Sequence, residues 1–198
     1  MSTVFVIGLA LGLRHAFDPD HLVAVTSMMS DGRRVRAASG VGLWWGAGHA
    51  ATLVGVGSVI LATGWSFPQA WQHRVEAMVG VTIVLLGVTV LRDQLRDRAG
   101  PGGRRALAVG AIHGIAGTGP LVIVLALSFP TLAQRYAALL ASALGTMCGM
   151  VLVTCGLTLS LVWSRSLDSR WHARLQLSVG AAGVVYGVGF TFRAFGMF

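Results

Sequence analysis

The hydrophobic positions of this 198-residue chain form long runs that charged residues rarely interrupt. No Asp, Glu, Lys or Arg lies between Arg36 and Arg74, between Arg105 and Arg135, or between Arg135 and Arg165. A helix of about 20 apolar residues spans a hydrocarbon core roughly 30 Å thick. Each of these stretches is therefore long enough for one membrane-spanning helix, which predicts an all-α membrane protein.

Three further stretches bring the predicted number of transmembrane helices to about six. Two are bounded by charge, roughly Gln69 to Leu91 and roughly Leu175 to Phe195, and Glu76 falls near one end of the first, in a Trp- and Arg-containing interface. The remaining one begins near residue 3, but its apolar run is interrupted by the polar octet 14–21 before a second apolar run reaches Met29. A signal peptide needs a basic start and a cleavage site of small residues. Neither is present, so we interpret residues 3–30 as one broken helix.

The break in this first helix is expected at Asp18–Pro19, because proline lacks an N–H donor and clashes with the preceding turn. Two geometries remain open. On an unbroken helix, His15, Asp18 and His21 would share an arc of roughly 120°, with Asp20 pointing elsewhere. In the other geometry, Asp18 caps a second half-helix whose first residue is Pro19.

The composition agrees with a membrane protein, and the charges add an orientation. Hydrophobic residues make up 55% of the chain and charged residues 11%, and all 15 basic residues are arginine, which gives a net charge of +8. Eleven of the arginines follow the first, third and fifth predicted helices. The positive-inside rule places these segments in the cytoplasm and both termini outside. The basic charge is thus an orientation signal in a multi-pass cytoplasmic (inner) membrane protein, and it does not indicate nucleic acid.

The chain is predicted to form a single transmembrane domain, residues 1–198, with two related halves. The halves, roughly 1–98 and 104–198, are joined by a cytoplasmic loop rich in Arg and Gly. Residues 12–15 (Gly-Leu-Arg-His) resemble residues 110–113 (Gly-Ala-Ile-His), and residues 46–49 faintly resemble 145–148. Three helices per half would invert the second copy, and such 3+3 inverted repeats with broken helices are a transporter architecture.

Ionisable side chains within the predicted membrane region mark the candidate site. A charged group at mid-bilayer costs at least about 2.5–3.5 kcal/mol, so it normally faces a cavity or a partner. Imidazole and carboxylate together form a ligand set suited to Ni, Co, Zn, Cu or Fe. The predicted metal ligands are His15, Asp18, Asp20, His21, His49 and His113, with Arg14 and Cys148 as supporting residues.

A purely structural interpretation of these residues stays open. Asp18 would then pair with Arg14 four residues earlier, and the histidines would bond to backbone groups. Part of this can hold even if metal binds, because Arg14 is expected to offset one carboxylate. His73 and His172 lie beside arginines and are interpreted as surface residues.

The octet resembles the signature of the nickel/cobalt transporter family (NiCoT/NicO), written His-x4-Asp-His. Residues 14–22 match the usual form of that motif closely, although Pro19 replaces an alanine and Leu22 an isoleucine. Residues 43–49 and 112–119 are similar to two further family segments, and the second favours the short, urease-accessory-type branch. The extra acidic motif of the longer members is not found here. The resemblance implies metal-uptake and selectivity roles for His15, Asp18, Asp20 and His21.

The sequence therefore favours a secondary transporter, not an enzyme, that moves Ni²⁺ or Co²⁺ as substrate and holds no cofactor. The ATP-binding motif Gly-x4-Gly-Lys-Ser/Thr is missing. A divalent cation moving inward gains about 4.6 kcal/mol per 100 mV of inside-negative potential, so uptake needs no other motor. The expected partners are the lipid bilayer and the cation, and a homo-oligomer or a cytoplasmic nickel chaperone stays open.

Other functions remain as alternatives. An exporter, or a transporter of another transition metal or of a small anion, would use the same membrane architecture. An intramembrane metalloenzyme is less favoured, because the chain has no His-Glu-x-x-His motif and no general-base carboxylate apart from the cluster.

Overall fold

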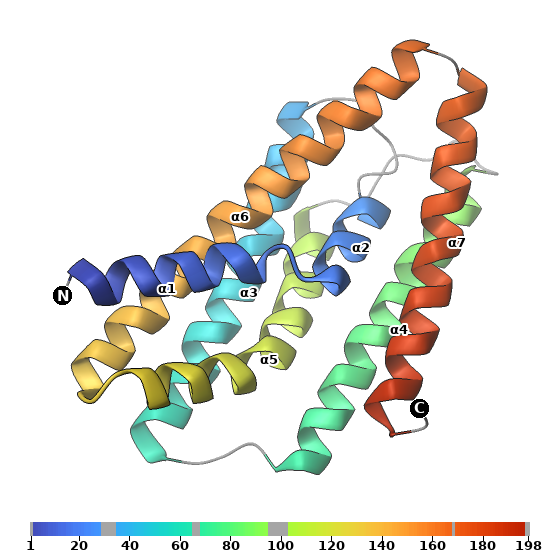
Figure 1. Cartoon of the computed structure of the whole chain (residues 1–198). Coiled ribbons are helices and arrows are strands. Elements are labelled where there is room, and N and C mark those ends of the chain that lie inside the picture. The colour runs from blue at the N-terminus through green and yellow to red at the C-terminus, as the bar shows by residue number, and fades with distance from the viewer. Residues whose placement is uncertain (1, 29–34, 65–67, 95–102, 168, 197–198) are drawn as a thin grey trace.

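The computed structural model describes residues 2–28, 35–64, 68–94, 103–167 and 169–196, and this part of the chain is all-helical. Most of the predicted loop between the halves, residues 95–102, lies outside these ranges. Residues 29–34, which include the end of the first predicted helix and part of the segment after it, also lie outside them. Figure 1 shows the arrangement. The helices are α1 (Ser2–His15), α2 (Pro19–Met28), α3 (Val35–Thr63), α4 (Gln69–Gln94), α5 (Gly103–Ser128), α6 (Leu132–Leu167) and α7 (Ser169–Ala194).

Four of these helices contain segments long and apolar enough to cross a membrane, judged over the described residues. They are Ser39–Thr63 in α3, Gln69–Arg92 in α4, Leu132–Ser160 in α6 and Ala173–Ala194 in α7. The chain is therefore a helical protein with several candidate spans, as its pattern of apolar runs predicts. The other two predicted spans correspond to α1 with α2 and to α5, and the count of six stays a prediction.

The first predicted helix is broken where Pro19 requires it. Helix α1 ends at His15, the N–H groups of Phe17 and Asp18 close two tight turns, and α2 begins at Pro19. The carbonyl of Asp18 accepts hydrogen bonds from the N–H groups of His21 and Leu22, at 3.0 and 3.1 Å. Asp18 thus takes the N-cap position and Pro19 the first helical position. The unbroken-helix geometry is wrong.

The helices pack in two groups with α2 between them. Helix α1 packs on α6, α5 packs on α3, and α3 packs on α6. Helices α4 and α7 form a separate antiparallel pair, seen at the right of Figure 1. Helix α2 contacts both members of that pair and also α6. The interruption between α1 and α2 therefore lies where the two groups of helices meet.

Glycines bring α1 against α6, and α5 against α3, in the same way. At six of them an added Cβ would overlap a backbone carbonyl oxygen of the facing helix, and the overlap is largest at four. In each of the two helix pairs, the glycine of one helix contacts the residue that lies three positions before the glycine of the other helix. The contact also occurs in the opposite direction, so the two contacts of each pair are reciprocal. The contacts are Gly12 with Ser142, Gly145 with Leu9, Gly110 with Trp45 and Gly48 with Leu107.

These contacts match Gly12 to Gly110, as the predicted repeat does. They match Gly145 to Gly48, whereas the sequence comparison aligns Gly145 with Gly46. Matched by these contacts, Cys148 would correspond to Ala51, whereas the sequence comparison sets it opposite His49. Residues 46–49 and 145–148 are identical only at their first glycine, so their sequences do not fix the register, whereas the glycine contacts depend on the backbone positions themselves. The repeat itself stays a prediction.

Candidate metal centre at the helix break

Four histidine rings from four helices converge beside the break. His15 ends α1, His21 lies in the first turn of α2, and His49 and His113 come from α3 and α5. The centroid of the His21 ring lies 4.7 Å from His15, 5.1 Å from His49 and 5.5 Å from His113. The rings of His15 and His49 are 5.2 Å apart. We call these four residues the imidazole cluster.

Three of the rings are oriented through Nδ1. The Nδ1 of His15 donates to Asp18 Oδ2 at 2.7 Å, and that of His21 lies 3.2 Å from Asp20 Oδ1. The Nδ1 of His113 donates to the Val109 carbonyl at 2.9 Å. A hydrogen bond of this kind fixes the tautomer, leaves the Nε2 lone pair available, and increases the basicity of the ring.

The remaining ring nitrogens of the cluster are buried without a hydrogen-bond partner among the described residues. They are Nε2 of His15, His21 and His113 and both nitrogens of His49. His21, His49 and His113 are almost completely enclosed. An unsatisfied buried polar group destabilises a fold by about 1–3 kcal/mol, so native proteins rarely tolerate several together. Such a cluster is expected where a ligand completes it.

The spacing of the donor atoms suits a transition-metal ion. One ligand atom each from His15, His21 and His49 lie within 4.8 Å of one another, and so do atoms of Asp18, Asp20 and His21. Imidazole binds Zn²⁺, an ion of similar size, at about 2.0–2.1 Å, which sets two ligands of one ion roughly 3–4 Å apart. The atoms of His15, His21 and His49 are therefore near the spacing that one ion requires.

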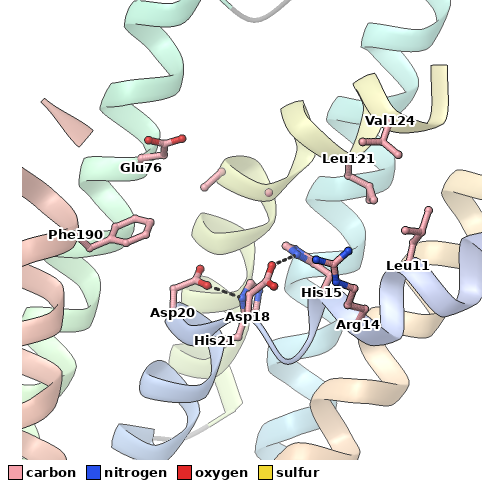
Figure 2. A pocket seen from close by; sticks show the side chains of 12 residues that line it. Leu11, Arg14, His15, Asp18, Asp20, His21, Glu76, Leu121, Val124 and Phe190 are labelled. Carbon is pink, nitrogen blue, oxygen red and sulfur yellow. Dashed lines mark hydrogen bonds and ion pairs between the residues drawn. The ribbon is translucent and has the colours of Figure 1, made fainter. Parts of the chain in front are cut away.

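A cavity of about 350 Å³ lies on the open side of the cluster, and we call it the vestibule. Figure 2 shows Asp18, Asp20, Glu76 and Arg14 around it, with Phe190 and Leu121 on its apolar walls. Glu76, expected from the sequence to lie in the membrane interface, lines the vestibule with the predicted ligands. Arg14 also lines it, but Asp18 is paired with His15, and no Arg14–Asp18 salt bridge forms within the described residues.

The structure therefore brings together every predicted histidine ligand and both aspartates. The predicted supporting residue Cys148 is exposed on α6 and does not belong to either donor group found among the described residues. Besides Glu76, two residues of the site are not predicted from the sequence. Trp45 packs its ring against His21 and His113, and Gly117 leaves room for His15, since a Cβ there would lie 2.7 Å from its Nε2. The only sign of Trp45 in the sequence is its position next to residues 46–49, the Gly-Ala-Gly-His segment.

The apolar helices and the buried imidazole–carboxylate cluster define a class, multi-pass membrane proteins with a polar site between their helices. Comparison with known proteins shows which members of this class the chain is similar to. The chain is 23% identical to the urease accessory protein UreH of Bacillus sp. (strain TB-90), over 98% of this chain and 92% of that protein. It is 43% identical to the high-affinity nickel transport protein of Cupriavidus necator, over 40% of this chain and 22% of that protein.

These two relationships support assignment of the chain to the nickel/cobalt transporter family, as its motifs predict. The name of neither relative describes an enzyme. No family model matches the chain. No solved structure matches it either.

Proposed function

We propose that this protein is a secondary transporter that takes Ni²⁺, Co²⁺ or both into the cell across the cytoplasmic membrane, through the imidazole cluster. The observation that carries the proposal is the convergence of unpartnered ring nitrogens from His15, His21, His49 and His113. A bound cation would satisfy these nitrogens, and the fold otherwise leaves them unsatisfied. The two relatives, one a nickel transport protein and one a urease accessory protein, support nickel as the substrate.

The donor set favours Ni²⁺ or Co²⁺ over the abundant Mg²⁺ and Ca²⁺. Imidazole suits transition metals, whereas Mg²⁺ and Ca²⁺ prefer oxygen ligands. In this proposal the Nε2 atoms hold the cation, while Asp18 and Asp20 orient His15 and His21 and balance the charge. Val109 would orient His113 through its carbonyl oxygen.

The direction of transport follows from orientation and potential. With both termini outside, the inside-negative potential drives a divalent cation inward by about 4.6 kcal/mol per 100 mV. The vestibule is lined by the early part of α4 and by residues 121 and 124 of α5, which this orientation places on the outer side. A cation would thus reach the cluster from outside.

We further propose that the two halves are inverted repeats. The reciprocal glycine contacts of α1 with α6 and of α5 with α3 support this, because a two-fold relation between the halves would generate them. The bend of α5 in Figure 1, a helix with Pro120 in its interior, would then correspond to the break between α1 and α2. Broken helices that meet near the middle of the membrane provide an ion site in such transporters.

Cellular nickel accumulation tests the proposed function. Cells that lack other nickel importers and express this chain are expected to accumulate radioactive Ni²⁺ above the level of cells with an empty vector. Excess unlabelled Co²⁺ should reduce the accumulation, because it fits the same donor set. Accumulation equal to the empty vector, in cells whose membranes contain the chain, would contradict uptake. Accumulation below that of the empty vector would indicate export. Uptake that anions reduce and Co²⁺ does not would indicate another substrate.

The orienting role of Asp20 gives a graded prediction. Asp20→Asn keeps an oxygen that can accept from His21 Nδ1 but removes the negative charge. Loss of a partner of this kind typically lowers metal affinity 10–100-fold. Calorimetric titration of Ni²⁺ into purified protein is expected to show a weakening within that range and no complete loss. An unchanged affinity would mean that Asp20 does not orient or charge-balance the cluster.

A further inference from the structure

The lining of the vestibule is negatively charged, although the chain as a whole is positively charged. The protein has a formal net charge of +8 and only seven carboxylates, yet three of them line this cavity. They are Asp18, Asp20 and Glu76, and Arg14 is the one guanidinium among the lining residues. With neutral imidazoles the lining carries a net charge of −2, three negative charges against one positive. Cavities lined by one sign of charge with apolar walls concentrate counter-ions.

The size of the vestibule fits a cation that has kept its water. A water molecule takes up about 30 Å³ in the liquid, so six waters around a divalent ion need roughly 180 Å³. The cavity holds about 350 Å³. By volume, the vestibule therefore has room for a hexahydrated ion, and the carboxylates that line it are able to accept hydrogen bonds from the bound water.

Asp18 and His21, both of which line the vestibule, lie at different depths. The Asp18 side chain is 46% exposed, whereas that of His21 is 2% exposed and presents an unpartnered Nε2. Glu76 comes from α4, away from the cluster in Figure 2, and its Oε1 lies 3.4 Å from the amide nitrogen of Gln72. The carboxylates of Asp18 and Glu76 thus lie in the outer part of the cavity, and the Nε2 of His21 lies at its base.

We infer that the vestibule is a separate binding position for a hexahydrated divalent cation, held through its water molecules by Glu76 and Asp18. The inference rests on the proposed function, since the ion held there would next lose water to the imidazole cluster. The outer position recognises charge and hydration only. Mg²⁺, which prefers oxygen ligands to imidazole, would therefore occupy it and fail to proceed to the imidazoles.

Hexaamminecobalt(III) is a probe for this position. Its six ammine ligands do not exchange, so it can bind through hydrogen bonds and charge but cannot coordinate imidazole. In proteoliposomes at constant ionic strength, it is expected to inhibit Ni²⁺ uptake competitively without being transported. Glu76→Gln should raise the KM for Ni²⁺ about three- to tenfold at unchanged maximal rate, by loss of attraction. It should weaken inhibition by the probe and by Mg²⁺ to a similar extent.

The control is Gln72→Leu, which removes the amide beside Glu76 but keeps the carboxylate and should preserve KM and inhibition. Constant ionic strength is needed because salt screens exposed charges. If the wild type takes up Ni²⁺ but the probe does not inhibit, or if Glu76→Gln changes neither KM nor inhibition, the outer position is overturned and the proposed function stands. If the wild type takes up no Ni²⁺, the proposed function itself fails.

Discussion

Nickel uptake is expected to fall to the background of the host cell when His49 is replaced by leucine, although the chain should fold at least as stably. Both ring nitrogens of His49 are buried and have no hydrogen-bond partner among the described residues. Its ring lies 5.2 Å from His15 and 5.1 Å from His21. A residue kept only for packing would have no reason to be an imidazole here, since leucine fills a similar space without an unsatisfied group.

The expected stability change has a definite sign. An unsatisfied buried polar group destabilises by about 1–3 kcal/mol, so His49→Leu should raise the unfolding temperature of the metal-free protein. A ligand at 100 times its dissociation constant stabilises the folded state by about 2.7 kcal/mol. Ni²⁺ should therefore raise the unfolding temperature of the wild type and have little effect on His49→Leu. Without metal, His49→Leu should therefore unfold at a higher temperature than the wild type, and Ni²⁺ should change that temperature little.

Thermal unfolding in detergent, with and without Ni²⁺, measures both effects beside the uptake assay. The matched control is His73→Leu, since His73 is a half-buried histidine of α4 that does not line the vestibule. It should keep both uptake and stabilisation by Ni²⁺. Normal uptake by His49→Leu would remove His49 from the site. Loss of uptake with a lowered unfolding temperature would point to a structural role.

The parts of the site that can be predicted from the sequence are those determined by residues close together in the chain. Pro19 breaks the first helix because its ring and its missing N–H act on the immediate chain. The break then brings His15 and Asp18 within hydrogen-bond distance and places His21 in the next turn. The glycines around His49 and His113 predict close helix approach, and those contacts are present.

The parts that sequence does not predict depend on which helices become neighbours. Glu76 reaches the vestibule because α4 packs beside α2, a contact between segments about 50 residues apart. Trp45 lies against His21 and His113 because α3 and α5 cross there. The Arg14–Asp18 pairing assumed a continuous helix, and the break replaced it with the bond to His15. Apolar runs determine that helices form, but they carry little information about which surfaces meet.

A single methyl group at Gly110 is expected to disrupt the fold and the site together. In Gly110→Ala the new Cβ would overlap the carbonyl oxygen of Trp45, a backbone atom that cannot rotate away. Helices α3 and α5 would have to separate, and forced overpacking of this kind destabilises by about 1–3 kcal/mol or more. His113 lies one turn beyond Gly110 and His49 one turn beyond Trp45, so the separation would also spread the imidazole cluster.

The matched control is Gly55→Ala on α3, where an added Cβ meets no atom within 4 Å. Alanine there removes only the conformational freedom of glycine in a helix and should leave the protein unchanged or stabilise it by about 0.5–1 kcal/mol. Unfolding temperature in detergent and Ni²⁺ affinity should both fall for Gly110→Ala and hold for Gly55→Ala. Equal unfolding temperatures for the two variants would show that α3 and α5 do not meet at this glycine. The convergence of His49 and His113 would then lose part of its structural basis, because that contact is one of the glycine contacts that bring the two helices together beside the cluster.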